Sequence, residues 1–196
     1  MVPARRLLLE GVYAFLTIRN GVPIGYVLVS ALFGSSEIAY NVFETWRGAE
    51  AAWIYGRVLA TTRAIFGSDT FTIYPYQLGG AGNEEGLASG AWWFYRKLGF
   101  SPRDRAARAL VRREEARMKR DPEHRSSRAT LMALGESNVY WHEGATRDDV
   151  IGLLSLANVG LAVTDLLAKR FGGEGERGAA ACVREATKLL GAGPAS

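Results

Sequence analysis

Residues 12–33 read VYAFLTIRNGVPIGYVLVSALF, two apolar runs separated by a short polar break. The first run, residues 12–19, alternates and is rich in β-branched and aromatic side chains, as strands are. Asn20 and Gly21 supply the positive φ angles that a tight hairpin turn needs, and Pro23 stands where a strand can begin without donating a ladder hydrogen bond. The pattern predicts a β-hairpin, with residues 24–33 as its second strand.

After the hairpin, the sequence predicts one more strand, and then the spacing of the apolar residues changes from that of a strand to that of a helix. Residues 37–44 predict a third antiparallel strand. In residues 49–66 apolar side chains recur at helical spacing, and residues 69–77 have the Thr, Phe, Ile and Tyr content of a strand. A loop with four glycines, residues 78–86, leads to a helical stripe at residues 87–98. The predicted order is a meander, a strand–helix–strand crossover and a covering helix.

Beyond Phe100 the pattern is mostly helical. Thr146 and Asp149 have the spacing of a capping box before a long apolar run. We expect helices at residues 104–120, 126–134, 147–171 and 176–190, and a short strand at residues 139–142. The fold class predicted is α+β: a mixed, mainly antiparallel sheet with covering helices in residues 1–100, followed by a mostly α-helical half, residues 101–196, as a second domain or extension.

The composition argues against a disulfide framework, a zinc site and a membrane-spanning helix. Cys182 is the one cysteine of the 196 residues, so no internal disulfide can form, and His124 and His142 are too few to complete a Cys/His zinc site. We expect a reducing, cytoplasmic compartment and no metal. The longest uncharged helical stretch, residues 150–164, is shorter than the roughly 18–20 residues that span a bilayer, so no membrane partner is expected.

The positive charge is concentrated in one segment. Residues 103–128 contain ten Arg or Lys against five Asp or Glu, whereas the whole chain carries +4. Such a segment could meet nucleic-acid phosphates, but mixed Arg and Glu on a helix usually form a solvated face, and no aromatics are interleaved for base stacking. The solvated face is favoured, and an RNA-associated protein stays a third alternative.

Two motifs, taken with the order of elements, resemble the GNAT superfamily of acyl-CoA N-acyltransferases. Residues 42–52, VFETWRGAEAA, fall where that family carries an Arg/Gln-x-x-Gly-x-Gly/Ala loop between a strand and a helix. Residues 91–100, AWWFYRKLGF, are similar to the family's Ala-x-x-hydrophobic-Tyr-x-x-x-Gly-Phe ending and are the more specific match. The resemblance covers residues 11–100, about half of the chain.

The resemblance implies a transferase that moves an acyl group from acetyl-CoA or another acyl-CoA to an amine of a small molecule or peptide. A backbone N–H near Val42 would bind the thioester carbonyl, Tyr95 would protonate the departing thiolate, and Glu44 would take the proton of the amine. A helix N-terminus offers unpaired N–H groups to a pyrophosphate. The residues that would cradle it are Trp46, Arg47, Gly48, Ala49 and Ala51.

The chain departs from the family pattern in three ways. Glu50 stands where a glycine is expected, so either Gly48 serves the turn and Glu50 points outward, or the pyrophosphate site is degenerate. The ten residues before Gly11 leave no room for the strand and two helices that usually precede the hairpin. Either Met1 is an internal start or the C-terminal helices replace that missing part. The helical block after Phe100 has no counterpart in the common fold, where strands usually finish the sheet. The alternative function is a catalytically inactive binding module that engages a protein partner or forms a homodimer.

Overall fold

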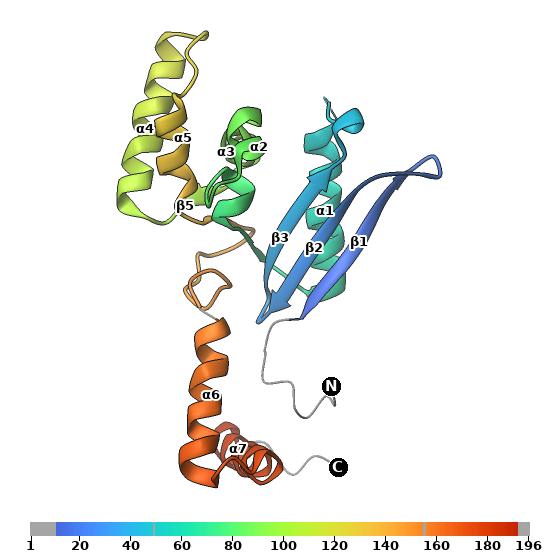
Figure 1. Cartoon of the computed structure of the whole chain (residues 1–196), viewed down its shortest axis with the longest axis vertical. Coiled ribbons are helices and arrows are strands. Elements are labelled where there is room, and N and C mark those ends of the chain that lie inside the picture. Colours follow the sequence, from blue (N-terminus) through green and yellow to red (C-terminus); the bar gives the residue numbers. More distant parts are fainter. Residues whose placement is uncertain (1–10, 49, 155, 192–196) are drawn as a thin grey trace. The chain divides into compact units, whose positions relative to one another are not determined.

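The computed structural model describes residues 11–48, 50–154 and 156–191. The chain divides into two compact units, of which the larger is Val12–Leu154 and the smaller contains the two last helices (Figure 1). The larger unit is built on a six-stranded sheet of order β1-β2-β3-β4-β6-β5, in which only β3 and β4 are parallel neighbours. The fold is therefore α+β with a mixed, mainly antiparallel sheet, as the sequence predicts.

The meander forms the first half of the sheet. It consists of β1 (Val12–Arg19), β2 (Val22–Leu32) and β3 (Ser35–Val42), each antiparallel to the next. The β1–β2 turn is the predicted one, because Asn20 and Gly21 adopt φ angles of 49° and 78°.

A strand–helix–strand crossover follows the meander and joins the parallel strands β3 and β4. The chain passes from β3 through a 3-10 turn, η2 (Glu44–Trp46), and helix α1 (Ala51–Phe66) to β4 (Thr70–Ile73). Strand β4 is shorter than the predicted 69–77, because Pro75 lacks an N–H donor and starts a second 3-10 turn, η3 (Pro75–Leu78).

The sheet is completed by residues beyond position 100. Helices α2 (Glu84–Ser89) and α3 (Ala91–Lys97) replace the single predicted helix, since Gly90 adopts φ 66° between them. Strand β5 (Ser101–Pro102), helices α4 (Arg105–Arg120) and α5 (Arg128–Gly135), and strand β6 (Val139–His142) follow. Strand β6 pairs with β4 on one side and β5 on the other, so the compact unit extends past residue 100 to Leu154.

One face of the sheet carries the core. Val27, Val29, Ile38, Phe71 and Ile73 are buried there against side chains of α1 and α3. Burying one such large side chain stabilises the fold by about 1.5–3 kcal/mol. The core also includes Val111, Leu134 and Val139 from beyond residue 100.

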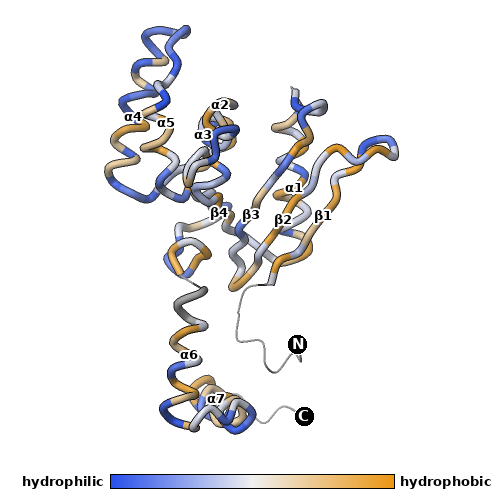
Figure 2. Tube along the Cα trace, in the orientation of Figure 1, coloured by the Kyte–Doolittle hydropathy of each residue, from blue (hydrophilic) through white to orange (hydrophobic). Residues whose placement is uncertain are grey.

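The opposite face of the meander is apolar and uncovered at β1 and β2. Val12, Leu16, Tyr26 and Leu28 share it by register and are 62%, 57%, 39% and 36% exposed. Figure 2 shows the apolar residues that run along both strands.

The segment 143–154 is a loop and not the start of a helix. The helix expected from residue 147 begins at Leu156, because Asp149 pairs with Arg147 and does not cap a turn. Val150 and Ile151 are buried instead, and Ile151 is held by hydrogen bonds with Ser35 Oγ (3.0 Å) and Thr72 Oγ1 (2.7 Å).

The smaller unit is a helical hairpin of α6 (Leu156–Phe171) and α7 (Gly175–Leu190). Gly178 of α7 lies against Leu167 and Phe171 of α6, and Arg170 pairs with Glu185 at 2.8 Å. No helix within the described ranges has the length and apolarity needed to cross a bilayer.

Candidate functional site

Strands β3 and β4 diverge after a short parallel contact. Their register joins Ser35 to Thr70, Ser36 to Phe71 and Glu37 to Thr72, after which β3 runs on to Val42 while the segment that follows β4 turns into η3. We call this place the β3/β4 divergence, bounded by residues 38–42 of β3 and by η3. The Gln77 side chain bridges it, because Gln77 Oε1 accepts a hydrogen bond from the Tyr40 N–H at 3.3 Å.

The backbone N–H groups of β3 alternate between its two sides. The Phe43 N–H donates to Ile24 O of β2 at 2.9 Å, whereas the Tyr40 N–H points to η3. Successive N–H groups of a strand point in opposite directions. The N–H of Val42 is therefore directed toward the β3/β4 divergence, the direction expected of a group that binds a thioester carbonyl.

Three tyrosines gather beside the divergence. The ring of Tyr55, from α1, lies 5.2 Å from the ring of Tyr40 and 5.5 Å from that of Tyr95, from α3. Burial raises the pKa of Tyr40 to about 12. Burial likewise raises the pKa of Tyr55 and of Tyr95, with the neighbouring phenols adding to it. All three phenols are thus protonated donors at neutral pH, and those of Tyr40 and Tyr55 find no hydrogen-bond partner among the described residues.

Tyr95 also belongs to the core. Its side chain is 4% exposed and packs edge-on against Phe94 and Phe100. The rigid packing fixes the direction of its phenol. Sequence reasoning missed Tyr40 and Gln77; the signal for Tyr40 was its position two residues before Val42, on the same face of the strand.

The expected phosphate loop lies at the end of β3. Arg47 donates from Nε to Val42 O at 3.0 Å and forms an ion pair with Glu85 of α2, so it spans from the loop to α2. Trp46 is 40% exposed, and a Cβ added at Gly48 would meet no atom within 4 Å. The Ala51 N–H donates to Gly48 O at 3.1 Å. Ala49 lies outside the described residues.

Glu50, the departure from the family pattern, is turned away from the loop. It occupies the N-cap position of α1 without capping it, and its carboxylate forms an ion pair with Arg19 of β1. This geometry agrees with the alternative in which Gly48 serves the turn and Glu50 points outward.

Glu44 is the first residue of η2, one residue beyond the Phe43 N–H that closes the β2–β3 pairing. Its side chain is exposed and makes no hydrogen bond with a described residue. It is brought to the same end of β3 as Val42 and Arg47, but on the solvent side.

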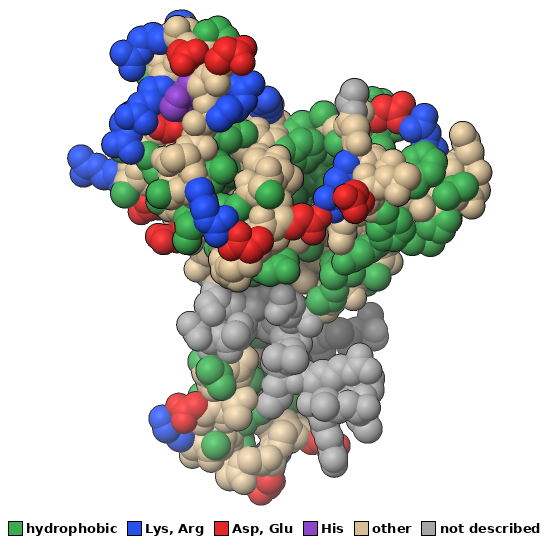
Figure 3. Space-filling model, turned by 45° about the horizontal axis from the view of Figure 1, so that its top comes forward, with side chains coloured by type: hydrophobic (Ala, Val, Ile, Leu, Met, Phe, Trp, Pro, Cys, Tyr) green, Lys and Arg blue, Asp and Glu red, His purple; other side chains and the backbone are tan. Residues whose placement is uncertain are grey.

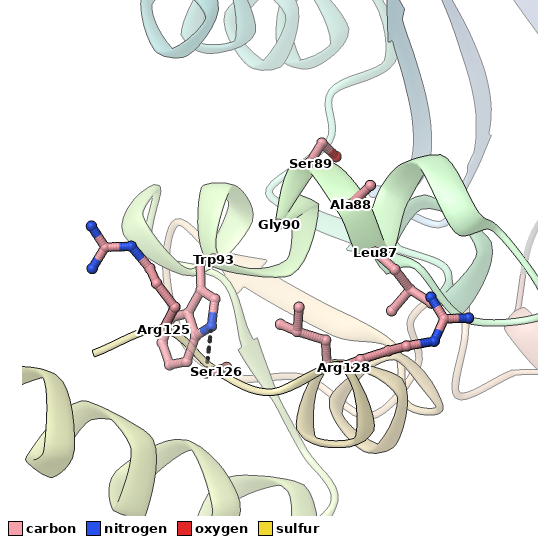
Figure 4. Close-up of a pocket in the computed structure, with 9 residues that line it drawn as sticks. Leu87, Ala88, Ser89, Gly90, Trp93, Arg125, Ser126 and Arg128 are labelled. Atoms are coloured by element: carbon pink, nitrogen blue, oxygen red, sulfur yellow. Dashed lines mark hydrogen bonds between the residues drawn. The ribbon is translucent and has the colours of Figure 1, made fainter. Parts of the chain in front are cut away.

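Two pockets lie away from the β3/β4 divergence. One, of about 450 Å³, is open to solvent and is lined by residues that include Leu87, Trp93, Arg125 and Arg128, with the Trp93 Nε1–H donating to Ser126 Oγ at 3.1 Å (Figure 4). The other, of about 780 Å³, lies between the hairpin tip and α1 and includes Glu50. Neither is lined by Tyr95 or Val42.

The described residues contain no group of three or more His, Cys, Asp or Glu side chains that could hold a metal ion. Comparisons of the chain with known protein families, with curated proteins and with solved structures find no match. Inference about function therefore depends on the geometry of the site itself.

Proposed function

We propose that residues 12–154 form a GNAT-like N-acyltransferase that holds the thioester of an acyl-CoA at the β3/β4 divergence and transfers the acyl group to a small-molecule or peptide amine. The observation that carries the proposal is the divergence itself. The only parallel neighbours of the sheet separate after three residue pairs. Tyr40 of β3 borders the separation, and the ring of Tyr95 lies one ring further, in contact with Tyr55. Strands β6 and β5 extend the sheet beyond β4, whereas the sequence predicted mainly helices there, and final strands of this kind support the proposal.

The chemistry needs no covalent enzyme intermediate. The amine nitrogen attacks the thioester carbonyl carbon, and the Val42 N–H stabilises the negative charge that develops on the carbonyl oxygen. As the carbon–sulfur bond breaks, Tyr95 donates its proton to the thiolate. Tyr95 is protonated at neutral pH, as this step requires, although burial raises its pKa and so makes it a weaker acid than a free tyrosine. Glu44, directly or through water, takes the proton that the amine nitrogen loses.

Ligand binding by thermal shift is the first test. The protein is titrated with CoA, acetyl-CoA and longer acyl-CoAs; a ligand at 100 times its Kd stabilises by about 2.7 kcal/mol and raises Tm by several degrees. Gly48→Glu should abolish the shift by placing a carboxylate against the pyrophosphate, with Gly144→Glu as the control, since a Cβ at either glycine meets no atom within 4 Å. No shift with any acyl-CoA would overturn the proposal.

Catalysis is tested separately from binding. Tyr95→Phe removes the proton donor and keeps the packing against Tyr55 and Phe100, so it should retain the acyl-CoA shift and lose about 10²–10⁴-fold in the rate of acyl transfer. An unchanged rate would remove Tyr95 from the mechanism.

One observation favours the second candidate, a binding module without catalysis. The uncovered face of β1 and β2 is apolar, and such a patch on a folded unit marks an interaction surface. A homodimer built on this face is the simplest form of the candidate. Leu16→Asn should then convert a dimer into a monomer in light scattering, whereas a wild-type chain that is already monomeric would exclude the homodimer.

A further inference from the structure

The solvent face of α4 is uniformly basic. Its cations are all exposed and fall, at 3.6 residues per turn, within an arc of about 140°. They are Arg105, Arg108, Arg112, Arg113, Lys119 and Arg120. We call this set the α4 basic face. Figure 3 shows Lys and Arg side chains gathered along this end of the molecule.

The acidic residues of α4 do not neutralise this face. Glu114 is fully buried on the opposite side of the helix, where it contacts Arg117 at 2.9 Å and Ser126 at 2.7 Å. Glu115 is paired with Arg96 of α3 at 2.8 Å. None of the six cations forms an ion pair with a residue that the structure describes. Arg and Glu residues that alternate in the sequence therefore lie on different sides of the helix. The balance of positive and negative charge that is typical of a solvated face is absent from the exposed face of α4.

The α4 basic face is also rigid. Ala107 and Val111 are buried beneath it, and Asp104 caps the helix by accepting from the Ala107 N–H at 2.7 Å. The cations are thus presented along a straight element of about 24 Å, a length over which a nucleic-acid duplex carries about fourteen phosphate charges. The backbone that carries the cations is already ordered, so only their side-chain freedom is lost when they meet such an array.

The side chains that lie between the cations favour a phosphate backbone over other polyanions as the ligand of this face. Ala109 and Ala116 are the only other residues in the arc, so the face offers no large apolar side chain for insertion into a lipid bilayer. It also offers no aromatic ring on which an unpaired base could stack. Charge and hydrogen bonding to phosphate are the interactions that remain.

We infer that the α4 basic face binds the phosphate backbone of double-stranded nucleic acid without reading its sequence. The inference does not depend on the proposed acyltransferase activity, because no residue of the β3/β4 divergence takes part. Phosphate contacts of this kind release counterions, so the affinity should fall steeply as salt is added.

The test is fluorescence anisotropy with short labelled duplexes of RNA and of DNA, each over a series of salt concentrations that starts at about 50 mM. The full-length protein should bind at low salt, with a slope of log K against log salt of about −3 to −5. The two duplexes show which nucleic acid has the preferred groove geometry. Single-stranded RNA and vesicles of anionic phospholipid are the comparison ligands.

The variant Arg108→Gln, Arg112→Gln, Lys119→Gln removes three of the six cations, those along one side of the face, and keeps good helix formers. It should weaken duplex binding by about tenfold or more and reduce the slope by about 2–3. The control, Arg177→Gln, Arg184→Gln, Lys188→Gln, removes the same charge from exposed positions of α7 and should leave the slope unchanged.

Three results would overturn the inference: no duplex binding by the wild-type protein at low salt, equal weakening in both triple variants, or tighter binding to single strands or to anionic vesicles than to either duplex. The last result would assign the face to a different polyanion. Circular dichroism confirms that each variant is folded before binding is compared.

Discussion

Glu114 is the most confined charge in the larger unit. Its carboxylate is buried within reach of Arg117, His124 and Ser126. Burial raises the pKa of Glu114, but the hydrogen bonds from Ser126 and His124 and the charge of Arg117 outweigh it, so the pKa lies below its ordinary value of 4.5. A carboxyl with a lowered folded pKa stabilises the fold above its unfolded pKa and loses that contribution as the pH falls through the folded value.

Glu114→Gln should therefore lower the free energy of unfolding by about 2–4 kcal/mol at neutral pH, because its partners lose a buried charged acceptor. The variant should also lose part of the decline in stability that the wild type shows below about pH 4.5. Urea denaturation across pH measures both effects. Glu115→Gln is the control: its pair with Arg96 is only half-buried and should be worth less than about 1 kcal/mol. Equal effects of the two substitutions would contradict this account.

Gly80 is a second sensitive position, for a steric reason. A Cβ there would lie 2.1 Å from Gly135 O and 2.9 Å from Pro75 O, both backbone atoms that cannot move aside alone. Gly80→Ala should lower the free energy of unfolding by about 1–3 kcal/mol. Gly56, inside α1, has open space around its Cβ position, and Gly56→Ala should instead stabilise the protein by about 0.5–1 kcal/mol. Thermal unfolding of both variants checks the opposite signs.

At the scale of elements, the contact between the η2–α1 loop and α2 should control ligand affinity. Arg47 is engaged by Glu85, and an arriving pyrophosphate must compete with that carboxylate. Glu85→Gln frees the guanidinium and should strengthen CoA binding by about two- to fivefold, whereas Arg47→Gln should weaken it by a similar factor. Calorimetry with CoA measures both. Glu84→Gln, which breaks the exposed pair with Arg128, is the control and should leave the affinity unchanged.

Local elements could be predicted from the sequence, and long-range pairings could not. The hairpin, α1 and the short strand β6 are confirmed because turn residues and periodicity act over a few positions. The break at Gly90 was missed because Leu87 and Leu98 continue one apolar stripe across it. Residues 147–154 were predicted as helix from their apolar pattern, whereas Val150 and Ile151 are buried against the sheet, a contact that no local pattern contains.

The residues of the candidate site could likewise be predicted only in part. Val42, Tyr95 and the loop residues could be selected because they stand in contiguous motifs. The part played by Gln77, the grouping of Tyr40 with Tyr55, and the pairing of Arg47 with Glu85 depend on segments that meet only in the folded chain. The basic residues of α4 show the same limit, since sequence alone did not reveal that Glu114 is buried behind them.

At the scale of the whole molecule, the positions of the core residues determine which shorter chains can fold on their own. The main hydrophobic cluster of the sheet unit runs from Val27 to Val139, and three of its members, Val111, Leu134 and Val139, follow residue 100, as do the buried Val150 and Ile151. A chain of residues 12–154 should unfold cooperatively on its own, whereas a chain of residues 12–100 should not. Circular dichroism during heating distinguishes them. Cooperative unfolding of the shorter chain would instead support a domain boundary near residue 100.

The insertion of β6 between β4 and β5 has a consequence during protein synthesis. Until residue 139 leaves the ribosome, β4 has only β3 beside it and its other edge is unpaired. Residues between β4 and β6 emerge over several seconds at about 5–20 residues per second. An open strand edge is a template for pairing with other chains. Nascent chains that pause within α4 or α5 are therefore the species that most need protection by a ribosome-associated chaperone.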